Sequence, residues 1–135
     1  MSFNLGGEKR IGMGEWTLEV TDVYERRHEH YEKKHPHELA AVTGNLDTYF
    51  KTLNEVNNPL QVKAGFIHNE PGGIKAIDQK GGRQKIKLQQ TRLYIFPDTS
   101  SKTLYLLTVG DKGTQRDDIN FCREYVRKEI IKKVE

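Results

Sequence analysis

Hydrophobic and polar side chains alternate along several short segments of the chain, as they do in half-buried β-strands. In residues 15–20, for example, Trp16, Leu18 and Val20 alternate with polar side chains. The sequence predicts four more strands, at residues 61–69, 74–78, 85–96 and 103–110. Only the short polar loop PDTSSK separates the last two segments. Because such a loop cannot hold a parallel crossover, we expect these two strands to form an antiparallel hairpin.

Hydrophobic side chains that recur every three or four residues predict helices between the first strand and the others. This spacing is clearest in residues 37–54, and Pro36 suits the first turn of that helix. A helix before it is expected to begin at Asp22, because Asp22 and Glu25 have the spacing of a capping box. The two helices together predict a helix hairpin.

A last helix is expected after the strands. Asp117 or Asp118 can cap its N-terminus. Its expected buried stripe is Ile119, Cys122, Val126 and Ile130. The order of elements is therefore a strand, two helices, a run of strands and a final helix, which indicates an α+β fold.

The chain has 135 residues, the length of one ordinary domain. Residues 1–14 contain four glycines and no periodicity, so we expect a flexible leader followed by a single domain over residues 15–135. Cys122 is the only cysteine, which excludes an intramolecular disulfide and favours a reducing, cytoplasmic compartment. No apolar run approaches the roughly 20 residues that a transmembrane helix requires.

The positive charge of the chain is concentrated in its second half. The whole chain carries 22 Lys and Arg against 19 Asp and Glu, a net charge of +3. Residues 72–115 alone contain eight cations and three anions. Such a basic stripe on a sheet is a candidate phosphate-binding surface. The alternative is an ordinary solvated face of the sheet.

The predicted strand at residues 85–96 carries cations on both faces. Lys85 and Lys87 lie on one face, and Arg92 lies on the other beside hydrophobic side chains. Burying a cation without a partner is costly. We therefore expect these side chains either to reach the rim of the sheet or to line a site that requires positive charge.

The predicted hairpin would gather these cations at one end. With a turn centred on residues 99–100, Arg92 would lie opposite Leu107, and Lys87 opposite Lys112. The expected cluster is Lys85, Lys87, Arg92, Lys112 and Arg116. Clustered cations can hold phosphates and can lower the pKa of a lysine enough for proton transfer. Since RNA carries its own 2′-hydroxyl nucleophile, such a site could cleave RNA without a metal ion.

The histidines of the first helix do not predict a metal site. The segment RRHEHYEKKHPH contains His28, His30, His35 and His37. Residues two apart on a helix point in different directions, and a metal site needs three or four ligands that converge. We expect a solvated, mixed-charge helix pair and no bound cofactor.

Three short motifs, taken with the order of elements, resemble the RelE/ParE superfamily of bacterial type II toxins. They are KIKL (85–88), TRLYIF (91–96) and LYLLTVGDK (104–112). The loop GDKGTQRDDI is similar to the KKTQ-type loop of the HigB and phage-derived branch. The resemblance covers about residues 16–130. It implies the order β-α-α-β-β-β-α, with an antiparallel or mixed twisted sheet between an N-terminal helix hairpin and a C-terminal helix.

The resemblance implies the toxin of a type II toxin–antitoxin system, an mRNA endoribonuclease (mRNA interferase) that uses metal-independent attack by the 2′-hydroxyl. Its expected partners are a cognate antitoxin and mRNA, on the ribosome or free, in the cytoplasm. Lys85 and Lys87 match lysines that contact the RNA backbone and assist proton transfer. Arg92 matches the arginine that stabilises the scissile phosphate, and Lys112 matches a basic residue after the VG step. Further RNA contacts are expected from Arg83, Arg116 and Lys75.

The chain departs from the RelE pattern at one position. RelE-type members place a tyrosine a few residues after the VG step, where this chain has Arg116, Asp117 and Asp118. Asp118 could take over its role, as acidic residues do in some HigB-like members. The alternatives are a non-catalytic binding module for a protein or nucleic acid, and a ParE-like inhibitor of DNA gyrase.

Overall fold

The computed structural model describes residues 16–81 and 88–134. Its helices are α1 (Asp22–Lys34), α2 (Pro36–Val56) and α3 (Gln115–Tyr125), and α3 continues as π and 3₁₀ turns through Val126–Ile130 and Ile131–Val134. Its strands are β1 (Thr17–Val20), β2 (Ile67–Asn69), β3 (Lys75–Ile77), β4 (Thr91–Asp98) and β5 (Thr103–Asp111). Short 3₁₀ turns lie at Pro59–Gln61, Pro71–Gly73 and Lys112–Thr114.

The strands form one mixed sheet in the order β1-β5-β4-β3-β2. β1 is parallel to β5, and the other neighbours are antiparallel. The predicted α+β class is therefore confirmed. Four strands follow the helix pair, one more than the order β-α-α-β-β-β-α implies. The two strands next to the helix pair in sequence, β2 and β3, have only three residues each.

Two of the predicted strands are shorter than expected. The strand predicted at 61–69 begins only at Ile67, because Pro59–Gln61 forms a 3₁₀ turn and the chain reaches the sheet later. The strand predicted at 85–96 begins at Thr91 and extends to Asp98. Residues 82–87 lie outside the described residues.

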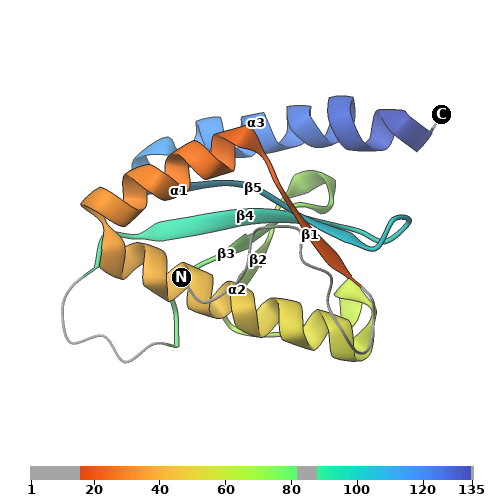
Figure 1. Cartoon of the computed structure of the whole chain (residues 1–135), viewed down its shortest axis with the longest axis horizontal. Coiled ribbons are helices and arrows are strands. Elements are labelled where there is room, and N and C mark those ends of the chain that lie inside the picture. Colours follow the sequence, from red (N-terminus) through yellow and green to blue (C-terminus); the bar gives the residue numbers. More distant parts are fainter. Residues whose placement is uncertain (1–15, 82–87, 135) are drawn as a thin grey trace.

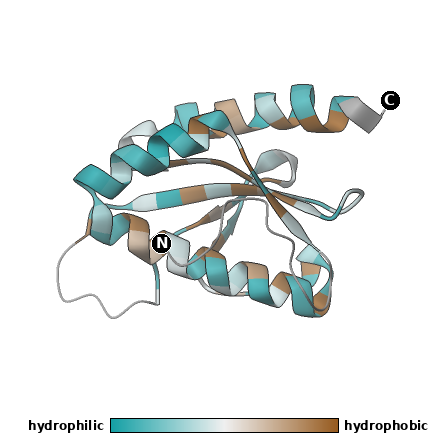
Figure 2. Ribbon diagram, in the orientation of Figure 1, coloured by the Kyte–Doolittle hydropathy of each residue, from teal (hydrophilic) through white to brown (hydrophobic). Residues whose placement is uncertain are grey.

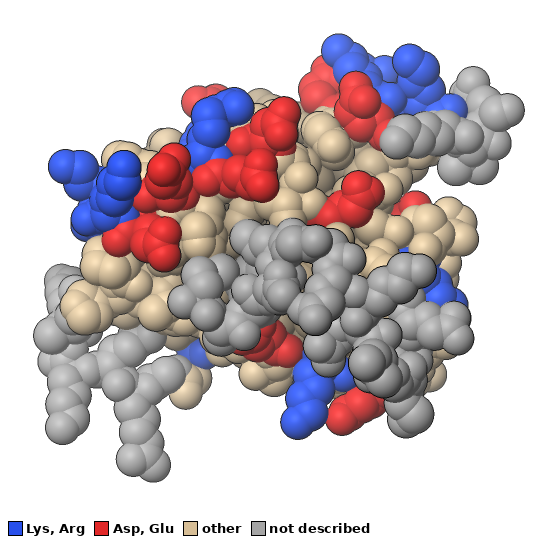
Figure 3. Space-filling view, viewed as in Figure 1, with Lys and Arg blue, Asp and Glu red and all other residues tan. Residues whose placement is uncertain are grey.

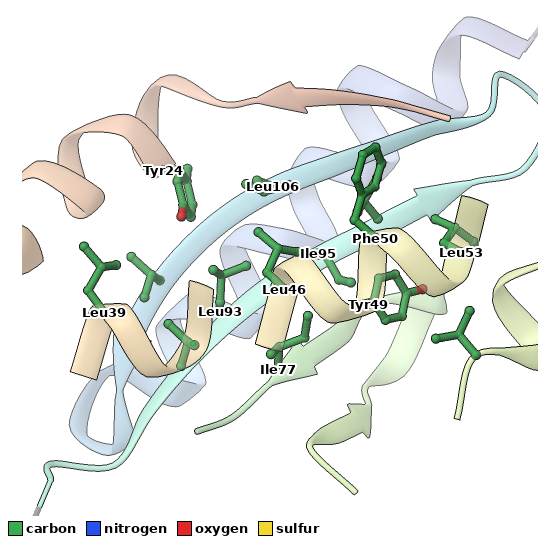
Figure 4. Packing of buried hydrophobic residues seen from close by; sticks show 14 of the residues in the cluster. Tyr24, Leu39, Leu46, Tyr49, Phe50, Leu53, Ile77, Leu93, Ile95 and Leu106 are labelled. Carbon is green, nitrogen blue, oxygen red and sulfur yellow. The ribbon is translucent and has the colours of Figure 1, made fainter. Parts of the chain in front are cut away.

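The helices cover both faces of the sheet (Figure 1). α1 and α2 bury the larger hydrophobic cluster, to which β4 contributes Leu93 and Ile95 (Figure 4). α3 covers the opposite face over Tyr94 and Leu107. Figure 2 shows many hydrophobic residues along the strands, whereas α1 is mostly hydrophilic. Because side chains of a strand alternate between its faces, residues of even number in β2, β3 and the first half of β4 lie on the α3 face.

β1 covers only half of the edge of β5, and α1 covers the rest. β1 pairs with residues 103–106 of β5. Beyond that point, the Thr21 hydroxyl donates to the Leu107 carbonyl at 2.7 Å, and Arg27 Nη1 donates to the Val109 carbonyl at 2.9 Å. Thr21 also caps α1 by accepting from the Tyr24 N–H, so the cap residue is Thr21 and not Asp22.

The β4–β5 hairpin has a different register from the predicted one. Arg92 lies opposite Gly110, not opposite Leu107. The turn is centred later in the chain than residues 99–100, since Asp98 pairs with Thr103. A bulge after Tyr94 then adds one residue to β5, and bulges are not visible in an alternation pattern.

The prediction that Asp117 or Asp118 caps the last helix is wrong. The cap belongs to the turn before it, where the Asp111 carboxylate accepts from the Thr114 N–H at 3.1 Å. Asp117 and Asp118 lie in the first turn of α3, and Asp118 is buried. An aspartate in a first turn is favoured by the helix dipole whether or not it caps, so the sequence alone does not separate the two positions.

Candidate functional site

The α3 face of the sheet carries two pairs of charged or ionisable side chains in front of α3. The registers place His68, Ala76 and Tyr94 in one row across β2, β3 and β4. Glu70 and Arg92 lie on the same face, on opposite sides of this row. The charged or ionisable side chains around this row form the candidate site. We call it the Arg92 site, and it consists of His68, Glu70, Asp78 and Arg92.

Glu70 and Arg92 approach each other across β3. Arg92 Nη1 lies 3.8 Å from Glu70 Oε2, and the two side chains are 18% and 14% exposed. One strand, β3, lies between their backbones, and Ala76 of that strand lies midway between them in the registers. The two long side chains therefore meet over a small one. At 3.8 Å the contact is an ion pair but longer than a hydrogen bond, so the guanidinium can still accept an anionic ligand.

His68 and Asp78 form the second pair. His68 Nε2 lies 2.5 Å from Asp78 Oδ2. Asp78 is buried, and its other carboxylate oxygen accepts from the Lys80 N–H at 2.8 Å. Its backbone carbonyl accepts from Asn45 of α2 at 2.8 Å, which fixes the residue from both sides of the sheet. The His68 side chain is 29% exposed, so its ring is partly open to solvent.

Two hydroxyl groups are buried under this site. Within the described part of the chain, Tyr94 Oη and Thr108 Oγ1 have no hydrogen-bond partner. Burial raises the pKa of Tyr94, the Asp118 carboxylate raises it further, and the Arg92 guanidinium lowers it. The opposing effects show that Arg92 and Asp118 both lie close to the Tyr94 ring.

Asp118, predicted as a catalytic residue, is buried in a contact between α1 and α3. Its carboxylate accepts from the Thr114 hydroxyl at 2.7 Å and lies 3.4 Å from Arg27 Nη1. Burial raises its pKa, although the Thr114 hydrogen bond and the Arg27 charge oppose the shift. A Cβ atom at Gly110 would lie 1.9 Å from Asp118 Oδ2, so only glycine fits there. With its side chain 3% exposed, Asp118 is enclosed by protein atoms and does not face a ligand.

The other predicted residues are placed differently. Lys112 is exposed in the turn after β5, two residues beyond the partner of Arg92, so these two cations lie at the same end of the hairpin. Arg116 is exposed on the first turn of α3. Lys75 lies on the other face, where it donates to Asn69 at 2.7 Å and burial lowers its pKa. Arg83, Lys85 and Lys87 lie outside the described residues.

A groove of about 430 Å³ separates α3 from the β2–β3 turn. Its apolar lining includes Ile74, Val126 and Ile131, and Ile131 is 52% exposed. Arg123 and Arg127 line the same groove, and Arg127 forms an ion pair with Glu124. Lys, Arg, Asp and Glu are mixed along α1 and the C-terminal part of the chain (Figure 3). The surface there is thus not of a single charge sign.

The sequence analysis did not identify His68, Glu70 or Asp78. Of these, His68 lies at the end of the strand predicted at 61–69 and Glu70 begins the turn EPGG, two residues later, so the two would share a face if the extended chain continued to Glu70. Among residues 16–81 and 88–134, no three His, Cys, Asp or Glu side chains are placed to hold a metal ion. Within the same residues, no helix is long and apolar enough to cross a membrane.

No protein-family model, curated protein or solved structure matches the chain. The functional assignment therefore depends on the residues of the site themselves.

Proposed function

We propose that the protein is the toxin of a type II toxin–antitoxin system and an mRNA endoribonuclease. The observation that carries the proposal is the Arg92 site. A half-buried arginine is held by one loose carboxylate contact, next to a partly buried histidine. A guanidinium in such a position can bind a phosphate through two hydrogen bonds once RNA displaces or shares Glu70.

In the proposed reaction, the 2′-hydroxyl of the RNA attacks the adjacent phosphorus. Lys85 or Lys87 removes the proton from that hydroxyl. Arg92, with Lys112 at the same end of the hairpin, stabilises the negative charge of the phosphorane. The products are a 2′,3′-cyclic phosphate and a 5′-hydroxyl end. Arg116 contributes an RNA contact, whereas the described position of Lys75 on the opposite face removes it from this set.

The proposal includes two partners. One is mRNA, on the ribosome or free in the cytoplasm. The other is a cognate antitoxin that holds the toxin inactive, encoded by a neighbouring short gene. Asp118 has no catalytic role in this proposal, because its carboxylate is enclosed between Thr114 and Arg27.

The test is bacterial growth after induced expression of the wild type, Arg92→Ala and a control, Lys51→Ala. Lys51 is an exposed cation of α2, on the opposite face of the sheet. We expect arrest by the wild type and the control, with new 5′-hydroxyl RNA ends, and growth with Arg92→Ala. Loss of one group that stabilises transition-state charge typically lowers the rate by about 10²–10³-fold. Arrest by a folded Arg92→Ala variant, with the same RNA ends, would contradict the proposal.

The groove beside α3 favours a second candidate, a non-catalytic binding module. Its apolar lining and the exposed Ile131 are typical of a protein-binding surface. This class includes a ParE-like inhibitor of DNA gyrase. It predicts arrest without new RNA ends, or no arrest at all. Binding to RNA mainly through phosphates would weaken steeply with salt, whereas binding to a protein through the groove would not.

A further inference from the structure

The proposed cleavage needs a proton donor for the departing oxygen, and the structure leaves that role open. The O5′ atom departs as an alkoxide unless it receives a proton, which makes a general acid useful. Asp118, the acidic residue predicted for this region, is enclosed by Thr114 and Arg27. We propose, on the basis of the function proposed above, that His68 is the general acid and that Asp78 orients it.

The Asp78 carboxylate is positioned to hold a protonated imidazole. One of its oxygens accepts from the Lys80 N–H at 2.8 Å, and the other lies 2.5 Å from His68 Nε2. The two nitrogens of an imidazolium ring are both donors. With Nε2–H directed to Asp78, the Nδ1–H is left for a ligand.

The position of His68 in the sheet brings it to the scissile phosphate. His68 pairs with Ala76, and Ala76 pairs with Tyr94. The contact between Glu70 and Arg92 also passes over Ala76, because that residue is midway between them in the registers. A phosphate bound by Arg92 on this face would therefore lie beside the His68 ring, above the small alanine side chain.

The other ionisable groups close to Arg92 are unsuitable as donors. Tyr94 and Cys122 are fully buried, and burial raises the pKa of each. Glu70 is the counter-ion of Arg92. Histidine is the side chain that ordinarily gains and loses a proton near neutral pH. In the described part of this site, the histidine is His68, and its side chain is 29% exposed.

The step balances without a further reactant. The 2′-oxygen forms its bond to phosphorus and gives its proton to Lys85 or Lys87. The bond between phosphorus and O5′ breaks, and O5′ keeps the electron pair. The Nδ1–H of His68 supplies the proton that converts this oxygen into the 5′-hydroxyl. His68 ends neutral and still donates Nε2–H to Asp78.

The experiment compares two RNA substrates that differ at one atom. In the second, sulfur replaces O5′ at the scissile phosphate, on mRNA programmed into ribosomes or free, whichever the wild type cleaves. A thiol has a pKa of about 8.5, so its thiolate leaves without a general acid. We expect His68→Ala to cleave the oxygen substrate about 10²–10⁴-fold more slowly than the wild type. We expect it to cleave the sulfur substrate at close to the wild-type rate.

Two variants keep the test decisive. His68→Gln can still donate to Asp78, and it should show the same selective loss if folding is not the cause. His37→Ala, an exposed histidine at the start of α2, should cleave both substrates as the wild type does. Equal losses on both substrates, or no loss on either, would overturn the role of His68 and leave the nuclease intact. Absence of cleavage by the wild type itself would overturn the proposed function.

Discussion

Two arginine–carboxylate pairs in this fold have the same chemical groups but different surroundings. Arg27 and Asp118 join α1 to α3, and the carboxylate has Thr114 as a second partner while the guanidinium has the Val109 carbonyl. Arg92 and Glu70 lie in front of α3 and are joined by one contact of 3.8 Å. The first pair has its hydrogen-bonding capacity used by the fold. The second retains capacity for a ligand.

The surroundings of the two pairs, rather than their residue types, distinguish a structural pair from a candidate functional one. Removing one member of a buried charge pair is destabilising, because the other member stays buried without its partner. A pair joined by a single contact of 3.8 Å has no hydrogen bond to lose, so disturbing it should cost less. The variants below test whether the two pairs differ in this way, from the largest expected change in stability to the smallest.

The largest effect is expected from Gly110→Ala, which disturbs the Arg27–Asp118 pair through packing. The new Cβ would lie 1.9 Å from Asp118 Oδ2 and 2.6 Å from Thr114 Oγ1. We expect the free energy of unfolding to fall by about 3 kcal/mol, the upper range for overpacking. Denaturant unfolding followed by circular dichroism measures it.

Gly44→Ala is the matched control for this variant. Gly44 lies within α2, and a Cβ there would meet no atom within 4 Å. The control should stabilise the protein by about 0.5–1 kcal/mol, because alanine is the better helix former. If Gly110→Ala were as stable as the wild type, Asp118 would not lie as close to Gly110 as described.

Asp118→Ala should have the next largest effect. It leaves the Thr114 hydroxyl and the Arg27 guanidinium without their carboxylate partner. We expect a loss of about 1–3 kcal/mol, the usual range for a buried polar group that loses its partner. Arg27 is 38% exposed, so water will replace part of the interaction and the lower half of the range is expected.

Thermal unfolding of Asp118→Ala beside Asp117→Ala would measure this loss. Asp117 is the exposed neighbour in the same turn, so its substitution controls for helix propensity and the helix dipole. Equal melting temperatures for the two variants would show that Asp118 is not a structural residue. Asp118 would then become a candidate for the catalytic role that the sequence suggested.

The smallest effect on stability is expected from Arg92→Ala. Its one described contact is a partly exposed ion pair, and such pairs contribute up to about 1 kcal/mol. The variant that should abolish RNA cleavage should therefore fold almost as well as the wild type. A loss of stability similar to that of Asp118→Ala would indicate that both arginine pairs are structural.

The sequence predicted the elements better than it predicted their contacts. The helix pair and the hairpin strands were found because periodicity and polar breaks are local properties of the chain. The register of the hairpin was missed because the bulge after Tyr94 changes the pairing without changing the alternation before it. The partner of Arg92 is therefore Gly110, three residues after the predicted partner Leu107.

The candidate site was predicted only in part, for the same reason. Arg92 was identified from its unexpected place on a hydrophobic strand face. His68 belongs to a three-residue strand, too short for its alternation to stand out, and Glu70 directly follows that strand. The burial of Asp118 depends on Arg27, 91 residues away, which no local pattern reveals.

The parallel pairing of β1 with β5 has a consequence for synthesis of the chain. Thr17–Val20 pair with Thr103–Leu106, so the first strand waits for nearly the whole polypeptide to leave the ribosome. Pairings so distant in sequence form late, because a long loop must close before they contribute stability. The residues of the Arg92 site lie in or next to β2, β3 and β4, so the site itself lies outside this late pairing.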